Sequence, residues 1–349
     1  MAIYERFKTE ADDPQNPDVV AGIRDILSSG MWSGGSGTLN SFFTSSTQSG
    51  STGQYYYDVY KTNPQTDSTA EVQFSVAYGH VEGSGSIGGK GVVGNRATAA
   101  IYSQFSNILL GPGEDKFKFG GDVVPNDAYF ITLQRARLRE KMDPGNWELH
   151  ISGSQGFNNI KLIDDSGATT DPTVNQGGRV FNIVSGSISG GTATIKTTAA
   201  NETASGSAGL FYPDLGMLVL NPQYLAGMGA SPHLAISSGS NSNSGNTVKL
   251  YQAISASGYF QARREEVISS THYFCRVGNK KFNFSSNPTY FTASDGSFTQ
   301  PTFFKNPKSY ITQVGLYNDA NELLAVAKLS KPLLKSFARE AIVKVKLDF

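Results

Sequence analysis

The sequence predicts a mainly β protein with a few short helices (α+β), organised as a multi-domain, β-sandwich-like scaffold with an extended N-terminal arm. The first supporting observation is composition. The chain of 349 residues has 38 glycines and only 17% charged residues, against about 7% glycine and about 25% charged residues in average proteins. The second is pattern, because short runs rich in Val, Ile, Tyr and Phe alternate with clusters of Gly, Ser, Thr and Asn. Such runs are typical of strands joined by turns. The length leaves room for two or three domains.

Residues 1–54 are predicted to form the N-terminal arm with one short helix. In residues 17–28 the apolar side chains recur at helical spacing, a proline stands in the first turn and Gly30 follows the end. Residues 33–53 are rich in Gly, Ser and Thr. Two interpretations of this segment stay open, namely an arm that crosses a neighbouring subunit or a segment that is disordered in the isolated chain.

Residues 55–152 together with 210–232 are predicted to form the core β/α domain. The strongest helix signal covers residues 96–110, where Asn95 can cap the start and Gly111-Pro112 ends the apolar stripe. The sequence Asp143-Pro144-Gly145-Asn146 predicts a turn. Strands are expected at residues 55–60, 71–78, 128–138 and 147–152, and a core-like run at 211–220.

Residues 153–209 are predicted to be a small all-β insertion, and residues 233–349 a C-terminal β domain that ends in a hairpin and one further strand. The hairpin consists of two β-prone runs, 310–317 and 322–330, around an Asn-Asp-Ala-Asn turn. After Lys331-Pro332, the run 341–349 alternates largely apolar with mostly charged residues, as a half-buried strand does.

No motif in the sequence indicates catalysis or cofactor binding. Residues 83–88 match G-x-G-x-x-G, but the expected helix starts about eight residues later and no acidic residue follows at about twenty residues, so a flexible turn is the better interpretation. His272 and Cys275 point to opposite faces of an expected strand, which makes Cys275 a buried structural residue. Asp164-Asp165 is expected in a turn. We therefore expect no enzyme activity, no cofactor and no metal site.

Charge and hydropathy further restrict the classes of partner that the chain could bind. The 29 basic and 29 acidic residues cancel, so no net field favours nucleic acid or an anionic membrane. The single cysteine excludes an intrachain disulfide framework. The start of the sequence lacks the long apolar run of a signal peptide, and no apolar run approaches the length of a membrane-spanning helix. We expect a protein made in the cytoplasm without membrane insertion.

Two groups of residues form the candidate assembly interface. Arg135, Arg137 and Arg139 would share one face of an extended strand with Lys141, either as a basic stripe for an acidic partner or as a face that forms ion pairs within the chain. The second group belongs to the hairpin, where aromatic and turn side chains offer contact area: Tyr310, Tyr317, Asn318 and Asp319.

Four segments also resemble a known family. Residues 100–112 (AIYSQFSNILLGP), 135–149 (RARLREKMDPGNWEL), 261–291 with their Asn-Phe-Ser-Ser-Asn-Pro core, and 310–336 are similar to structural proteins of T4-like contractile-tailed bacteriophages, especially those of cyanophages. Residues 153–209 interrupt the resemblance. No catalytic residues come with it.

The resemblance implies a non-enzymatic virion protein on the tail side. It implies a baseplate component, wedge or fibre-attachment, that is assembled in the host cytoplasm and holds neighbouring subunits together. Its partners would be other tail or baseplate proteins and a tail fibre, with multiple copies per virion. Two alternatives stay open, namely a head or neck decoration or connector protein, and a β-rich tail module that binds or cleaves glycans.

Overall fold

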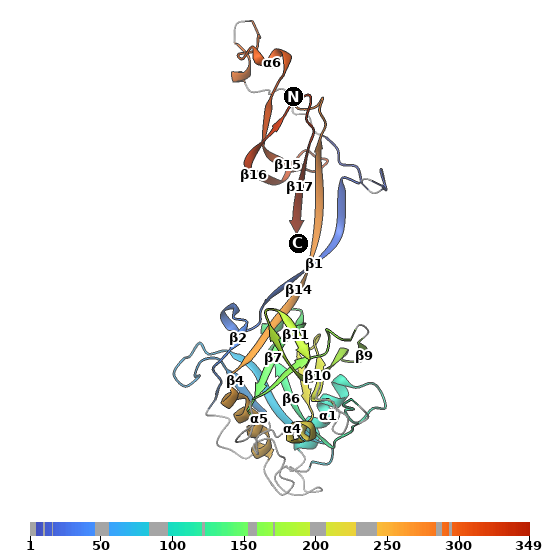
Figure 1. The fold of residues 1–349 in the computed structure, drawn as a ribbon, viewed down its shortest axis with the longest axis vertical. Helices are drawn as coiled ribbons and strands as arrows, with labels where there is room; N and C mark the ends of the chain where they lie inside the picture. Colours follow the sequence, from blue (N-terminus) through green and yellow to red (C-terminus); the bar gives the residue numbers. More distant parts are fainter. Residues whose placement is uncertain are drawn as a thin grey trace. The chain divides into compact units, whose positions relative to one another are not determined.

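A computed structural model describes most of the chain (Figure 1). The described residues are 5–9, 11–15, 17–45, 56–83, 97–120, 123–152, 159–169, 172–195, 207–227, 243–283, 288–292 and 295–349. The predicted cap at Asn95 and residues 84–88 of the predicted flexible turn lie outside them. No helix in these ranges is long and apolar enough to cross a membrane.

The protein is mainly β, as the sequence predicts, with 49% of its residues in strands and 15% in helices. It divides into two compact units, one made of Met1–Ile26 with Val267–Phe349 and the other of Leu27–Glu266. We call them unit 1 and unit 2. Their boundaries are not those of the predicted domains. The reason lies in β1 (Val19–Gly30) and β14 (Phe260–Val277), because each of these two long strands contributes residues to both units.

Unit 2 contains one large antiparallel sheet whose strands follow the order β14-β7-β8-β10-β12-β13-β6-β5-β4-β3. The short strands β2, β9 and β11 pair at its margins with β14 and β10. The strand bounds are β2 (Thr38–Leu39), β3 (Phe43–Thr44), β4 (Tyr56–Tyr60), β5 (Val72–His80), β6 (Asp127–Leu133), β7 (Lys141–Ile151), β8 (Ile160–Asp164), β9 (Thr173–Asn175), β10 (Gly178–Ser189), β11 (Thr192–Ile195), β12 (Gly209–Tyr212) and β13 (Met217–Leu220). The helices of unit 2 are η1 (Ser33–Gly35), α1 (Ala97–Leu109), α2 (Arg135–Leu138), α4 (Pro222–Gly227) and α5 (Asn243–Ser257).

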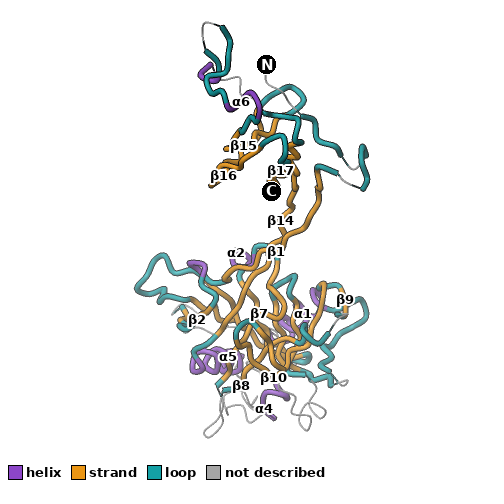
Figure 2. The backbone as a smooth tube through the Cα atoms, turned by 45° about the horizontal axis from the view of Figure 1, so that its top comes forward, coloured by secondary structure: helices purple, strands orange, loops and turns teal. Residues whose placement is uncertain are grey.

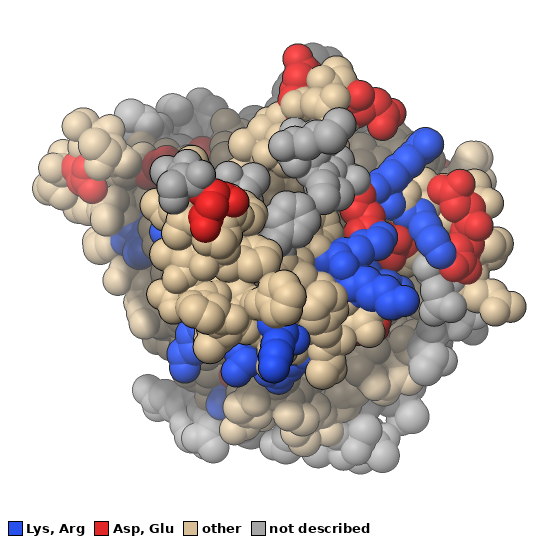
Figure 3. All heavy atoms as spheres, turned by 90° about the horizontal axis from the view of Figure 1, so that it is seen from above, with Lys and Arg blue, Asp and Glu red and all other residues tan. Residues whose placement is uncertain are grey.

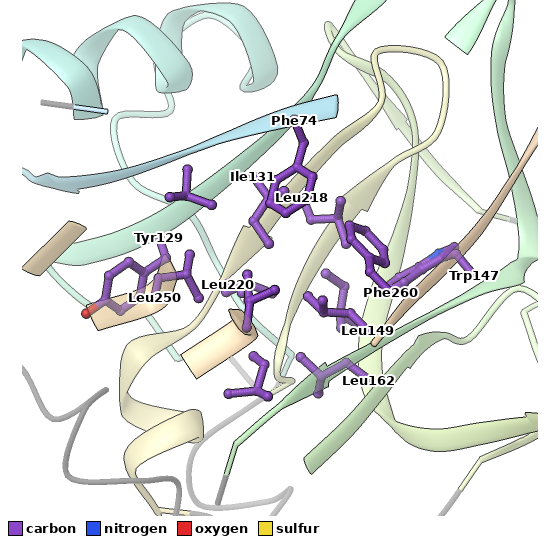
Figure 4. Close-up of a cluster of buried hydrophobic side chains, with 14 of the residues drawn as sticks. Phe74, Tyr129, Ile131, Trp147, Leu149, Leu162, Leu218, Leu220, Leu250 and Phe260 are labelled. Atoms are coloured by element: carbon purple, nitrogen blue, oxygen red, sulfur yellow. The ribbon is translucent and has the colours of Figure 1, made fainter. Parts of the chain in front are cut away.

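The main core of unit 2 forms because this sheet curls around one cluster of side chains (Figure 4). Phe74 of β5 and Phe260 of β14 come from strands far apart in the sheet order, yet their ring centroids lie 5.5 Å apart. Trp32 packs against both rings and donates a hydrogen bond from Nε1 to the carbonyl of Phe260 at 3.0 Å. Leu250 and Ile254 of α5 complete the cluster. The buried area of these large side chains is the main stabilising term of the unit.

A second cluster lies on the other face of the sheet beneath α1, which confirms the helix predicted at 96–110. Phe105 of this helix stacks on Phe130 of β6 with centroids 4.1 Å apart. Tyr102 accepts a hydrogen bond from the backbone N–H of Phe117 at 3.1 Å. Strand alternation explains why β5 and β6 serve both clusters, since successive side chains point to opposite faces.

The turn predicted at residues 143–146 is a bulge within β7 instead. Met142 pairs with Arg264 and Trp147 with Ala262, so four residues of β7 lie opposite one residue of β14. Gly145 supplies a positive φ of 78° at this point. Its N–H donates to both carboxylate oxygens of buried Asp164, at 3.1 and 2.9 Å. The chain continues as a strand because β14 pairs with it on both sides of the bulge.

The helix predicted at residues 17–28 is wrong, since these residues belong mainly to β1. The spacing of their apolar residues fits a helix, but pairing with β14 decides the conformation. The extended arm is also wrong for residues 31–42. Trp32, Leu39 and Phe42 are buried in the main core of unit 2.

Residues 153–209, predicted as an insertion, supply β8, β9, β10 and β11. Two of these strands, β8 and β10, lie between β7 and β12 in the sheet order. They therefore form part of the main sheet rather than a separate layer. The predicted core run at 211–220 corresponds to β12 and β13, which pair with each other.

Unit 1 has two β layers (Figure 2). One contains β14 and β17 (Ala341–Asp348), which pair antiparallel from Ser270↔Asp348 to Val277↔Ala341. The other is the predicted C-terminal hairpin, β15 (Ser309–Tyr317) with β16 (Leu323–Lys335). Two short helices, η3 (Pro288–Tyr290) and α6 (Thr302–Lys305), precede the hairpin.

Candidate assembly interface

The core of unit 1 is small. Its buried apolar side chains are Leu316 of β15 with Ala341, Val343 and Val345 of β17, out of 49 such residues among the described residues of the chain. The partly buried side chains of the hairpin that pack against them include Val314, Ala325 and Ala327. Phe7 packs its ring against Tyr273 of β14, with centroids 5.5 Å apart. The two β layers of unit 1 are thus held together by one small apolar core.

Large apolar side chains are instead concentrated on the surface of unit 1. Of the 19 exposed large hydrophobic residues among the described ones, 13 belong to this unit, although it is less than half the size of unit 2. Exposed apolar surface on this scale marks a contact site more often than a free surface. They are Ile26, Phe282, Phe291, Phe298, Phe304, Tyr310, Tyr317, Leu323, Leu324, Val326, Phe337, Ile342 and Phe349.

The outer face of the hairpin carries the densest part of this surface. Gly315 pairs with Val326 and Tyr317 with Leu323, all on the side turned away from Val314 and Leu316. All four residues are exposed. Because Gly315 has no side chain, the ring of Tyr317 can lie over it, and a Cβ on Gly315 would be 2.9 Å from that ring. We call Tyr317, Leu323, Leu324 and Val326 the hairpin face.

The predicted turn residues have different roles. Asn318 is structural, because its Oδ1 accepts the N–H of Glu322 at 2.8 Å and its Nδ2 donates to Oε2 of Glu322 at 2.7 Å. Asn321 follows with a positive φ of 61°, a conformation that asparagine tolerates well. Asp319 lies exposed at the tip. Tyr310, at the other end of β15, is 61% exposed.

A compact aromatic cluster precedes the hairpin, and sequence analysis missed it. Tyr290 contacts Phe291, Phe298 and Phe303, with ring centroids 5.1 to 5.6 Å apart. Phe291 and Phe298 also stack on each other and form an isolated β-bridge. Asp295 fixes the connecting turn, and hydrogen bonds from Thr292 and Ser297 lower its pKa to about 2. The density of aromatic residues in 290–304 was the available signal.

The predicted basic stripe does not exist as one strand face. Leu133 ends β6, and Arg135 begins the short helix α2. The chain turns there because Leu138 is buried against Gly216, where a Cβ would lie 2.4 Å from the leucine side chain. Arg139 then adopts a positive φ of 56°. These turns separate the arginine side chains.

Most of these basic side chains form ion pairs with acidic residues of unit 2. Arg137 forms an ion pair with Glu71 at 2.9 Å, and Arg139 one with Glu266 at 2.7 Å. Lys141 pairs with Glu265 at 2.9 Å. Arg135 is exposed and only approaches the carbonyl of Glu140 at 3.5 Å. On the face shown in Figure 3, one group of basic side chains likewise lies beside acidic ones, and much of the face is uncharged.

The predicted orientation of His272 and Cys275 is confirmed. The ring of His272 contacts Phe274 edge-on at 6.4 Å, while Cys275 packs into the core of unit 1 from the other face of β14. Burial raises the pKa of the Cys275 thiol, which makes it a poor nucleophile. Within the described ranges, no group of three or more His, Cys, Asp and Glu side chains could hold a metal ion.

The buried ionisable groups of unit 2 are held by neighbouring groups of the sheet. Glu148 of β7 contacts His150 Nε2 at 2.5 Å and accepts the N–H of Ile188 at 2.5 Å. Asp127 of β6 accepts a hydrogen bond from the Tyr78 hydroxyl at 3.3 Å, and burial raises the pKa of Asp127 to about 6. Asp164, predicted in a turn, is the last residue of β8 and accepts the N–H of Ser166 at the start of the following turn. The other bonds come from distant strands, since Asp164 accepts the N–H of Gly145 and Asp165 that of Asn182.

The comparisons with known proteins add no relative. Neither the known protein families, nor the curated proteins, nor the solved structures contain a match to this chain.

Proposed function

We propose that this protein is a non-enzymatic virion structural protein of a contractile-tailed bacteriophage. Within the particle we propose a baseplate position, as a wedge or fibre-attachment component that holds neighbouring subunits together. Its partners are other tail or baseplate proteins and a tail fibre, and it is present in multiple copies per virion.

The observation that carries this proposal is the imbalance between the two units. Unit 2 buries most of its large apolar side chains, whereas unit 1 buries four apolar residues and exposes 13 large ones. A chain that exposes so much apolar surface on one β scaffold gains stability by covering that surface with a neighbour. The sequence resemblance to tail proteins supports a phage particle as the place where this happens.

Incorporation into particles tests the proposal. The double variant Leu324→Asp/Val326→Asp places two charges on the hairpin face, where both residues are exposed. We expect it to fold but to be incorporated into purified particles at less than about a tenth of the wild-type level, since charges buried at a contact are costly. The matched control is Val174→Asp, an equally exposed apolar residue of β9 in unit 2. It should be incorporated normally.

Two outcomes contradict the proposal. Absence of the wild-type chain from purified particles removes the virion role. Equal incorporation of the double variant and the wild type removes the hairpin face as the contact surface.

The aromatic cluster supports a second candidate function, a glycan-binding tail module. Phe291 and Phe298 are exposed beside Tyr290, and exposed aromatic rings are contact platforms. Binding of host surface glycans that is lost in Phe298→Ala, while incorporation stays normal, would support this candidate. A glycan array without any signal would exclude it.

A further inference from the structure

β15 lies at the edge of its sheet. β15 and β16 form a two-stranded sheet of their own, so within the described residues no strand pairs with the other edge of β15. An edge strand with unpaired backbone groups can take up another strand. The sequence of residues 309–317, Ser-Tyr-Ile-Thr-Gln-Val-Gly-Leu-Tyr, has no charge and no proline. It therefore lacks the usual features that block strand addition.

The register with β16 also leaves β15 regular. Ile311 pairs with Leu333 and Gln313 pairs with Lys328. An advance of two residues along β15 therefore corresponds to five residues along β16. Between Leu316 and Tyr317 one step corresponds to two. Both irregularities thus place their extra residues on β16. β15 itself therefore has no extra residue at either irregularity.

The other strands of the two layers are protected by their side chains. β16 carries Lys328, Lys331 and Pro332, and its bulge contains the proline. β17 carries Lys344 and Lys346, which would face each other in an antiparallel pair of two copies centred on Val345. These features disfavour strand addition at β16 and β17, but β15 has none of them.

The free edge of β15 is complementary to itself. In an antiparallel pair of two copies centred on Gln313, residues 310–316 all find uncharged partners. Tyr310 then lies opposite Leu316 of the partner subunit, and Thr312 opposite Val314 of the partner subunit. Leu316 and Val314 face the core of unit 1, so this register places the exposed ring of Tyr310 beside the partner subunit's core. It would cover a ring that is 61% exposed in the single chain.

We propose that the partner at this edge is a second copy of the chain, paired antiparallel through β15 around a two-fold axis at Gln313. The two hairpins then form one four-stranded sheet in the order β16-β15-β15-β16. This pairing uses the edge of β15 rather than the hairpin face, and it rests on the proposed role of unit 1 as the part of the chain that contacts neighbouring subunits. Its test is made with the purified chain and does not depend on which particle contains it.

Gln313 allows a specific test because the residue opposite its side chain differs between the single chain and the proposed dimer. Its cross-strand neighbour in the same chain is Lys328, so Gln313→Glu adds a favourable pair to the hairpin. In the two-fold pair the same change places two glutamates opposite each other. We expect sedimentation analysis to show a dimer for the full-length wild type and a self-association constant weakened roughly tenfold or more for Gln313→Glu. Ser330→Glu, an exposed change on β16, is the matched control and should remain dimeric.

A mixture of variants tests the axis itself. Gln313→Lys alone should also have a weakened self-association constant, because two lysines meet at the axis. An equal mixture of Gln313→Glu and Gln313→Lys should restore the dimer, since opposite charges then face each other. Thermal unfolding of each variant confirms that the hairpin is folded.

The outcomes separate this inference from the proposed function. A monomeric wild type at tens of micromolar, a Gln313→Glu chain that dimerises like the wild type, or a mixture that does not recover would each overturn the inference. None of these results bears on the presence of the chain in particles. Conversely, absence from particles leaves a dimer with these properties intact.

Discussion

The ring of Tyr317 lies over Gly315 on the outer face of the β15–β16 hairpin, where a Cβ on the glycine would lie 2.9 Å from the ring. An aromatic side chain that covers a glycine in a strand shields the backbone and adds apolar contact. Leu323 closes the same site, 3.2 Å from that Cβ position. The hairpin face is therefore ordered before any partner arrives, which lowers the entropy cost of a contact there.

We expect Tyr317→Ala to lower the free energy of unfolding of unit 1 by about 1 kcal/mol, because the cover over Gly315 is lost. Ile342→Ala is the matched control on β17, where the side chain is 59% exposed, and it should change stability by less than about 0.5 kcal/mol. Thermal unfolding of both variants compares them. Equal effects would mean that the ring does not stabilise the hairpin.

Gly209→Ala should destabilise unit 2 by about 2–3 kcal/mol, because the added Cβ would lie 2.3 Å from the carbonyl oxygen of Val219, a backbone atom of the paired strand. The control is Gly167→Ala, where nothing lies within 4 Å of the new atom. Urea unfolding of both variants measures the difference. A Gly209→Ala chain as stable as the control would contradict the packing of β12 against β13.

Asp127→Asn should remove a pH dependence of stability. Burial raises the pKa of Asp127 from 3.8 to about 6 in the folded protein, so its contribution is full below about pH 4 and is lost as the pH rises through about 6. At pH 7.5 we expect the variant to be more stable than the wild type by about 2 kcal/mol, and at pH 4 to be similar. Urea unfolding at both pH values tests this, and an equal difference at both would exclude the titration of Asp127 as its cause.

The two tryptophans should respond differently to replacement by phenylalanine. Trp32 donates from Nε1 to the carbonyl of Phe260, whereas the Nε1 of buried Trp147 has no hydrogen-bond partner among the residues that the structure describes. Trp32→Phe should therefore cost about 1 kcal/mol more than Trp147→Phe, since it leaves a buried carbonyl without this donor. Chemical unfolding of both variants measures the costs, and the reverse order would count against the bond.

Removal of residues 310–349 should affect the two units differently. It takes away β15, β16 and β17 and with them the buried apolar residues of unit 1 in the described ranges. The two core clusters of unit 2 contain only residues between Met31 and Ala262. We expect calorimetry to show the transition of unit 2 and none for unit 1. Loss of both transitions would mean that unit 2 needs the C-terminal strands to fold.

The sequence predicted those elements whose hydrophobic period and terminal turn residues indicate the same structure. It missed elements whose conformation depends on pairing with a strand that is distant in the sequence. The hairpin around Asn318 and the helix before Gly111 have local signals at both ends. In β1 the apolar residues between Val19 and Leu27 fit helical spacing, and only pairing with β14 makes them a strand.

The same limit applies to the candidate interface. An alternation of Arg with other residues at 135–139 looks like a strand face, but the burial of Leu138 turns the chain into α2. The partners of Arg137 and Arg139, Glu71 and Glu266, are far away in sequence, so no local pattern indicates these pairs. The exposure of Leu324 and Val326 could not be predicted from the sequence either. Alternation assigns residues to the two faces of a strand, but it does not show that an apolar face is exposed.

Immunogold electron microscopy of purified phage particles, with antibody raised against this chain, tests the central claim most directly. The account predicts gold at the tail tip, in several copies per particle. Gold on the head or collar would move the protein to a decoration or connector role while leaving its assembly surface in place. No labelling of intact or disrupted particles would contradict the account.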